Sequence, residues 1–198
     1  MVKLQARTHV TATLSNAKRF PIDEAELKID ELPLHAIVRV QGRSNDRAFR
    51  AGCADVFGTA LPDAEQTSAL AHGRLAWVTP NEWLYFGPIE QESAVTGSLA
   101  TAFHGLFATV TKLSDARVAF VVQGRRAAEF LAKGSGIDFA SHAFPVGRAV
   151  TTRFAGIAAM IIRLAPLEYA LYFDVSLAGF LLDWLIDSAA EFATPAHL

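Results

Sequence analysis

Apolar residues fall into two successive series along the chain, each with the spacing of strands and helices. The first series predicts a strand, a helix, two strands and a helix, over residues 36–41, 46–57, 74–79, 82–86 and 90–106. The second predicts two strands, a helix, three strands and a helix, over residues 107–112, 116–123, 125–132, 148–154, 158–164, 168–173 and 176–192. Both series share the order strand, helix, strands, helix.

Glycine and polar residues mark the expected helix ends. Gly58 follows the first helix of the first series, where a left-handed glycine commonly ends a helix. Gly134, preceded by the cation Lys133, is expected to cap the corresponding helix of the second series in the same way. Ser176 is a candidate N-cap for the last helix.

Landmark residues recur at a nearly constant separation. Gln41 and Gln123 close similar apolar runs and lie 82 residues apart (123 − 41). Pro62 and Pro145 lie 83 residues apart (145 − 62), and Tyr85 and Tyr172 lie 87 apart (172 − 85). The repeat predicts an α+β fold built from a duplicated strand-helix-strands-helix module with pseudo-twofold symmetry.

The charge pattern separates an N-terminal arm from the rest. Residues 1–34 lack clear periodicity, and their cations precede their acids. The arm is either solvated or an extended strap along another subunit, and we favour the strap. Residues 35–198 are expected to form a single duplicated domain, with a first half at about 35–106 and a second half at about 107–192.

Composition narrows the classes of partner. Apolar residues make up 52% of the chain and charged residues 19%, an excess that favours a buried partner surface. A net charge of −2 favours neither nucleic acid nor an anionic membrane. The N-terminus lacks the features of a secretory signal, and the longest uncharged apolar run, residues 154–162, is too short for a membrane span. These features predict a cytoplasmic protein.

Residues suited to catalysis, cofactor binding or metal binding are not grouped in the sequence. Phosphate-binding glycine motifs are missing, and the six histidines are scattered. Cys53 lies on an apolar helical face with Phe49, Val56 and Phe57, which predicts a buried and inert thiol. Asp183, Asp187 and Glu191 form an acidic stripe that is either solvated or faces a basic partner. We therefore predict no catalytic, cofactor-binding or metal-binding residue on this chain.

Arginines of the second half are the main interface candidates. They lie near the ends of predicted strands, and arginine is well suited to paired hydrogen bonds with carboxylates at interfaces. Local salt bridges and caps are the alternative for each of them. The set comprises Arg117, Arg125, Arg126, Arg148, Arg153 and Arg163, of which Arg117, Arg125, Arg148 and Arg153 are the interface candidates.

Several segments, taken in order, resemble the gamma subunit of heterotetrameric sarcosine oxidase. In the first half the similarity lies in Pro80-Asn-Glu-Trp-Leu84 and Gly87-Pro88, where Trp83 becomes a further interface candidate. In the second half it lies in Leu113-Ser-Asp-Ala-Arg-Val118, Gly124-Arg-Arg-Ala-Ala-Glu-Phe-Leu-Ala-Lys-Gly134, Ile137-Asp138, His142-Ala-Phe-Pro-Val-Gly-Arg148, Thr151-Thr-Arg153, Tyr172-Phe-Asp-Val-Ser176 and Asp183-Trp184-Leu185. The resemblance covers roughly residues 35 to 192.

This resemblance implies a fold and a set of partners. The fold is that of the folate-binding domain of the glycine-cleavage T-protein, described as a duplicated α+β unit. The partners are alpha, beta and delta subunits, which carry the NAD, tetrahydrofolate, FAD, FMN and zinc of the complex. That complex oxidatively demethylates sarcosine to glycine, with hydrogen peroxide and formaldehyde or methylenetetrahydrofolate as the other products. This chain would buttress the large alpha subunit without a cofactor of its own.

Two departures from the resemblance keep alternatives open. Ser135 stands where relatives commonly have cysteine, and the catalytic Asn-x-x-Gly-Gly-x-x-Asp-Asp pattern of the T-protein is missing. One alternative is a stand-alone folate-binding or one-carbon-transfer protein that holds a pterin with Asp115 or Asp138, although both suit turns or caps better. Another is the small subunit of a related N-methyl amino acid dehydrogenase.

Overall fold

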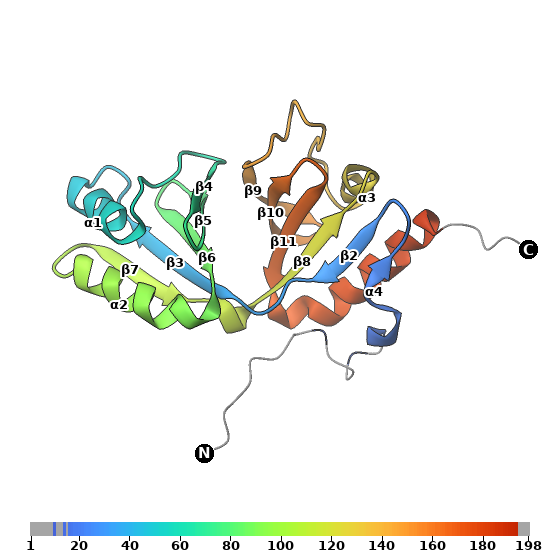
Figure 1. Cartoon of the computed structure of the whole chain (residues 1–198), viewed down its shortest axis with the longest axis horizontal. Coiled ribbons are helices and arrows are strands. Elements are labelled where there is room, and N and C mark those ends of the chain that lie inside the picture. Colours follow the sequence, from blue (N-terminus) through green and yellow to red (C-terminus); the bar gives the residue numbers. More distant parts are fainter. Residues whose placement is uncertain (1–9, 11–13, 15, 194–198) are drawn as a thin grey trace, which may run out of the picture. The chain divides into compact units, whose positions relative to one another are not determined.

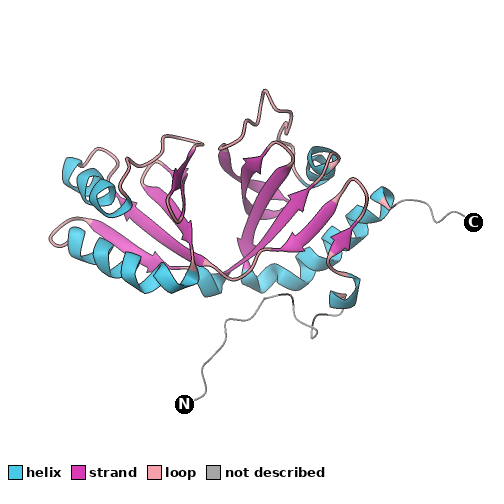
Figure 2. Cartoon of the chain, in the orientation of Figure 1, coloured by secondary structure: helices cyan, strands magenta, loops and turns pink. Residues whose placement is uncertain are grey.

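The computed structural model describes residues 10, 14 and 16–193, and it divides the chain into two compact α+β units. The middle unit consists of residues 35–115 and 147–150. The terminal unit consists of the described residues of 1–34, 116–146 and 151–198. Each unit has one sheet and two α-helices (Figure 2). The predicted α+β class and the duplication are confirmed.

The middle unit is built on a five-stranded antiparallel sheet in the order β4-β5-β6-β3-β7 (Figure 1). Its strands are β3 (Ala36–Gly42), β4 (Thr67–Leu70), β5 (Gly73–Thr79), β6 (Glu82–Gly87) and β7 (Ala108–Lys112). Its helices are α1 (Arg47–Phe57) and α2 (Glu92–Ala102), with short 3₁₀ turns at Ile89–Gln91 and Ser114–Ala116.

The terminal unit holds a six-stranded sheet in the order β1-β2-β8-β11-β10-β9. Its strands are β1 (Ile22–Asp23), β2 (Lys28–Glu31), β8 (Arg117–Gln123), β9 (Ala149–Phe154), β10 (Ile157–Ala165) and β11 (Glu168–Asp174). Its helices are α3 (Ala127–Gly134) and α4 (Ala178–Ala189), with 3₁₀ turns at Ala17–Arg19, Val175–Leu177 and Ala190–Phe192.

Alternate residues of the middle sheet pack against both helices. Side chains from one face of β3 and β6 share a buried cluster with residues of α1 and α2. Every second strand residue faces the same side, so the pattern aims one row of apolar side chains at the helices. The cluster includes Ala36, Val38, Val40, Phe49, Cys53, Leu61, Leu75, Trp83, Tyr85, Leu99 and Phe103.

Aromatic rings fill the corresponding core of the terminal unit. Phe154 of β9 lies 4.9 Å from Trp184 of α4 between ring centroids, and 5.9 Å from Phe173 of β11. Phe130 of α3 contacts Trp184 edge to face at 5.9 Å. Edge-to-face pairs bury large apolar areas in a preferred electrostatic geometry, so they fix the two helices on this sheet.

Strand register shows that the two sheets repeat each other residue for residue. Gln41 pairs with Glu82 between β3 and β6, as Gln123 pairs with Glu168 between β8 and β11. A register shift interrupts β5 between Trp77 and Thr79, and another interrupts β10 between Arg163 and Ala165, opposite equivalent residues. Because a β-bulge occurs at the equivalent position of both sheets, it is a regular feature of the duplicated module.

The predicted landmarks need one correction. Since Glu82 is equivalent to Glu168, the register makes Tyr172 equivalent to Phe86 and Leu171 equivalent to Tyr85. Pairing Tyr85 with Tyr172 was therefore wrong by one residue, which on a strand is a change of face.

A better landmark is the buried aromatic residue that follows the strand-opening glutamate. Trp83 faces Val40, and its indole N–H donates to the carbonyl of Pro62 at 3.0 Å. Tyr169 faces Val122, and its hydroxyl donates to the carbonyl of Phe139 at 3.3 Å. Both rings thus anchor the loop that follows the first helix of their unit, with a polar atom satisfied inside the core.

The first strand of each repeat completes the sheet of the other repeat. β7 pairs with β3, although residues 107–112 were predicted to belong to the second half. β2 pairs with β8, and Lys28 faces Gln123 as Thr109 faces Gln41. The division after residue 106 therefore does not follow the sheets, because β7 pairs within the middle sheet, whereas the division after residue 34 coincides with a boundary between the two units.

The described part of the N-terminal arm packs on its own chain. β2 lies within the terminal sheet, and the Asn16 side chain donates to Asp183 of α4 at 2.6 Å. Arg19 lies 4.0 Å from the Asp187 carboxylate. Residues 16–31 thus pack within the terminal unit of their own chain, while the predicted arm residues 1–9, 11–13 and 15 lie outside the described residues.

Helix ends match the sequence expectation at one of three places. Gly58 ends α1 in the left-handed conformation, with φ of 70°, as predicted. Gly134 is the last residue of α3 and its cap Ser135 is extended, so no left-handed glycine cap forms there. Ser176 does not cap α4, because its N–H and hydroxyl both donate to Asp174, which caps the preceding 3₁₀ turn.

Two glycines of the middle unit give a test of its packing. A Cβ at Gly42 would lie 2.5 Å from the Phe49 ring, whereas a Cβ at Gly97, inside α2, would meet nothing within 4 Å. We expect Gly42→Ala to lower the free energy of unfolding by about 1–3 kcal/mol through overpacking. Gly97→Ala should raise it by about 0.5–1 kcal/mol because alanine favours the helix.

Urea denaturation of the two variants and the parent chain measures both effects. No loss for Gly42→Ala would contradict the packing of α1 against the end of β3, and a loss for Gly97→Ala would contradict the open surroundings of Gly97 on α2.

Candidate partner interface

The predicted arginines do not gather into one patch. Arg117 begins β8 and Arg125 follows its end, eight residues later, so about 26 Å of extended chain separates them. Arg148 belongs to the middle unit and is held by an ion pair with Glu65, in which Nε lies 3.0 Å from the carboxylate. Arg125 and Arg153 are exposed, and Arg153 donates to the Gly156 carbonyl at 3.3 Å.

Arg117 lies at one end of the two central strands of the terminal sheet, beside the aspartate that caps the following 3₁₀ turn. It faces Asp174 across β8 and β11. Hydrogen bonds from the hydroxyl and then the N–H of Ser176 lower the pKa of the Asp174 carboxyl, and the charge of Arg117 adds a smaller effect. Arg117 therefore has a local role beside Asp174. This agrees with the alternative stated for these arginines, a salt bridge or cap within the chain.

Arg126 and Arg163 also have local roles. Arg126 forms an ion pair with Glu129 at 2.6 Å and lies over the Phe192 ring at 4.2 Å. Arg163 is only 6% exposed and donates to the main-chain carbonyls of Phe144 and Pro166. Its guanidinium lies 5.3 Å from the centre of the Tyr169 ring. Arg163 therefore holds the loop before β9 in place.

Trp83 is not available to a partner. The side chain is 2% exposed and lies in the core of the middle unit. Position 83 shares a strand face with Tyr85, the face that packs on α1 and α2. The prediction of Trp83 as an interface residue was wrong, because the segment that resembles the gamma subunit places this ring in the core.

The acidic stripe on α4 contacts residues of the same unit. Asp183 accepts from Asn16, and Glu191 pairs with Lys133 of α3 at 2.7 Å. Asp187 remains largely exposed beside Arg19. These contacts favour the solvated reading of the stripe, with pairing inside the chain.

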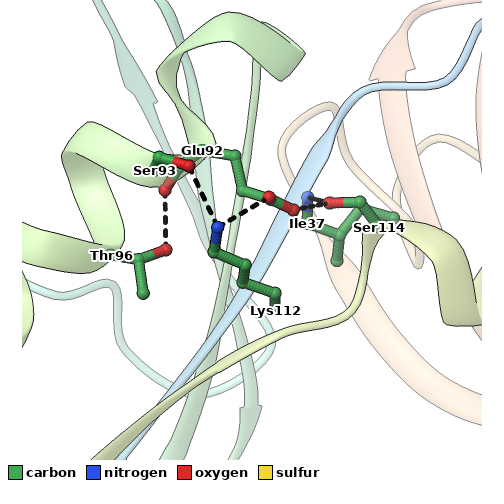
Figure 3. Close-up of polar contacts among 6 residues, drawn as sticks. All are labelled: Ile37, Glu92, Ser93, Thr96, Lys112 and Ser114. Carbon is green, nitrogen blue, oxygen red and sulfur yellow. Dashed lines mark hydrogen bonds and ion pairs between the residues drawn. The ribbon is translucent and has the colours of Figure 1, made fainter. Parts of the chain in front are cut away.

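The most connected polar cluster joins β3, α2 and the end of β7 (Figure 3). The Ser114 hydroxyl accepts from the backbone N–H of Ile37 at 2.8 Å and donates to the Glu92 carboxylate at 2.5 Å. Lys112 lies 3.1 Å from the other Glu92 oxygen and donates to the Ser93 hydroxyl at 3.0 Å. Thr96 donates to the Glu92 carbonyl at 2.6 Å.

This cluster serves the fold. Ser114 is 4% exposed and satisfies a buried backbone N–H at the place where the chain leaves the middle sheet. Glu92 is the first residue of α2, where the partial positive charge of the helix end favours a carboxylate. Nothing in the spacing of these residues along the sequence predicts the cluster.

The other residues considered for catalysis or ligand binding have structural surroundings within the chain. Burial raises the pKa of the Cys53 thiol to about 12 despite the nearby charge of Arg50, so this core thiol stays protonated and weakly nucleophilic. Asp138 accepts from the N–H of Ala140 at 2.8 Å, as a cap does, and Asp115 lies in a 3₁₀ turn. Within the part of the chain that the structure describes, no three His, Cys, Asp or Glu residues group as metal ligands do.

The family model described as sarcosine oxidase, gamma subunit family matches residues 41–191. The chain belongs to this family. One gamma subunit, from Arthrobacter sp., is 31% identical to it over 150 residues, which are 75% of this chain and 73% of the relative. Another, from Corynebacterium sp. (strain P-1), is 29% identical over 148 residues, or 73% of this chain and 71% of the relative.

Solved structures place this gamma-subunit family member in the expected fold. A chain of heterotetrameric sarcosine oxidase from Corynebacterium sp. U-96, solved with pyrrole 2-carboxylate, superposes with a TM-score of 0.85 at 23% identity, covering 98% of this chain and 100% of that one. Glycine cleavage system aminomethyltransferase T from Bartonella henselae superposes with a TM-score of 0.61 at 15% identity, covering 86% of this chain and 48% of that one. The expected T-protein-like fold is confirmed.

None of the helices in the described part of this gamma-subunit family member is both long and apolar enough to cross a membrane.

Two serines of the polar cluster offer a matched test of its role in the family member. Ser114→Ala leaves the buried N–H of Ile37 without its acceptor, so we expect the free energy of unfolding to fall by about 1–3 kcal/mol. Ser93→Ala removes only an exposed contact with Lys112 and should cost less than about 0.5 kcal/mol. Urea denaturation measures both variants, and equal losses would contradict this account of the cluster.

Proposed function

We propose that the chain is the gamma subunit of a heterotetrameric sarcosine oxidase and acts there as a structural subunit. The match of the gamma-subunit family model over residues 41–191 carries the proposal. Fold likeness to a chain of such a complex, over 98% of this chain, supports it. The T-protein likeness covers 48% of that protein and concerns the fold alone, so it does not favour a stand-alone folate enzyme.

The proposed partners are alpha, beta and delta subunits. FAD, FMN, NAD, tetrahydrofolate and zinc belong to these partners in the proposal, and the complex converts sarcosine, water and O₂ into glycine, formaldehyde and hydrogen peroxide. Tetrahydrofolate captures the one-carbon unit as methylenetetrahydrofolate when it is present. The gamma chain buttresses the alpha subunit and contributes no reacting group.

The use of polar side chains in the structure supports a structural role. Trp83, Tyr169 and Arg163 donate their buried hydrogen bonds to main-chain carbonyls of loops. Ser114 and Glu92 join strands to a helix. Buried polar groups that stabilise loops give a rigid surface on which a partner can assemble with little ordering cost.

Co-expression with the alpha, beta and delta subunits of the same organism tests this function. A tag on this chain should recover a four-component complex that carries flavin absorbance and releases hydrogen peroxide with sarcosine. The tagged chain expressed alone should show neither property. Elution of this chain as a free monomer in the presence of all three partners would refute the proposal.

A further inference from the structure

A highly exposed aromatic side chain lies directly before β7. Phe107 is 81% exposed, and its neighbours Leu106 and Ala108 are half-buried. Figure 1 shows the loop before β7 at the same end of the middle unit as the start of α1. Covering an exposed phenylalanine removes a large apolar area from water, so the position favours a contact with another surface.

A guanidinium group accompanies this ring. Arg43, at the end of β3, lies over Phe107 with its central carbon 5.3 Å from the ring centre. Arg43 is exposed, and none of the ion pairs among the described residues involves its guanidinium. A cation held over an aromatic face keeps its N–H groups directed outward for an incoming acceptor.

Two more arginines extend the positive charge onto α1. Arg47 and Arg50 are exposed and form no ion pair with a described carboxylate, and Arg50 donates only to the Ser44 carbonyl at 3.5 Å. The nearby acids are occupied. Asp46 caps α1 by accepting from two backbone N–H groups, and Glu82 accepts from Gln41 at 2.9 Å. Both carboxylates keep their negative charge while they bind neutral donors, so the three arginines exceed these two acids by one positive charge (3 − 2).

A cavity of about 400 Å³ opens between the ring and the end of the sheet. Leu106, Phe107 and Ala108 give it an apolar wall, and Gln41, Arg43 and Asn81 give it polar groups. Most of the polar groups are engaged, since Asn81 accepts from the Ser44 N–H at 2.9 Å and Gln41 contacts Thr109 and Glu82. The cavity can thus receive an apolar side chain, with Arg43 at its rim.

We propose that this surface, formed by Arg43, Arg47, Arg50, Leu106 and Phe107, docks a segment of a partner subunit that carries an apolar side chain beside a carboxylate. The proposal rests on the proposed function as a subunit. The apolar side chain enters the cavity beside Phe107, and the carboxylate pairs with Arg43. A second copy of this chain docked face to face would bring two arginine clusters together, and like charges oppose that contact.

Competition inside the complex tests the surface. The parent chain and one variant are co-expressed with the alpha, beta and delta subunits, and mass spectrometry measures the ratio of the two chains in the purified complex and in the total extract. We expect Phe107→Ala and Arg43→Glu each to be depleted about 10-fold or more from the complex. Arg43→Lys keeps the charge without the planar fork and should be depleted less than Arg43→Glu.

Phe180→Ala serves as the matched control, because Phe180 is an exposed phenylalanine of α4 with 49% exposure. It should enter the complex within about 2-fold of the parent chain. Thermal unfolding of the purified variants checks that Phe107→Ala and Arg43→Glu keep the stability of the parent, as exposed positions should.

The outcomes separate the two proposals. If the parent chain fails to join the complex, the proposed function fails. If the parent joins and both Phe107→Ala and Arg43→Glu compete equally with it, only the docking surface is overturned. Equal depletion of Phe180→Ala would also overturn it, since any exposed phenylalanine would then have the same effect.

Discussion

Backbone pairing of two strands with the opposite repeat is the constraint on which both units depend. β7 closes the middle sheet beside β3, and β2 occupies the equivalent place beside β8. Equivalent hydrogen bonds continue past the strands, from the Leu32 N–H to Ala119 and from the Leu113 N–H to Ile37. Without these partners, β3 and β8 would each leave a row of backbone groups unpaired. All strands of the middle sheet lie within residues 35–115, whereas the terminal sheet combines β1 and β2 with strands that begin at residue 117, so the terminal unit forms only when these two distant segments pair.

Elements with strong alternation or helical spacing could be predicted from the sequence. β3, β5, β6, β8 and both flanking helices of the middle unit follow that pattern closely. β2 could not be predicted, because Ile29 is its only apolar residue and its identity depends on pairing with β8. The assignment of β7 failed for a related reason. Periodicity identifies a strand and its buried face, but the neighbouring strand is chosen by contacts far away in the sequence.

The candidate interface was harder to predict than the fold. The arginines were expected near strand ends. Arg117 and Arg125, however, lie at opposite ends of β8, and Arg148 is paired with Glu65. Trp83 and Phe107 show the main difficulty. The Trp83 ring is 2% exposed and the Phe107 ring 81%, although Trp83 is the second residue of β6 and Phe107 directly precedes β7, each in an apolar context. A residue that matches the family can belong to the core or to a partner interface. Only the face of the sheet on which its side chain lies distinguishes the two cases.

Native-state amide hydrogen exchange of the whole chain, resolved by residue, is the most direct test of how β7 and β2 pair with β3 and β8. The amides of Leu32 and Leu113 donate across the two equivalent strand pairs at 2.9 Å and 2.7 Å. We predict that both amides are protected as strongly as the central amides of β3 and β8, because each opens only when its sheet unfolds. Exchange of either amide at the rate of an unstructured peptide would contradict the claim that strands from opposite repeats complete the two sheets.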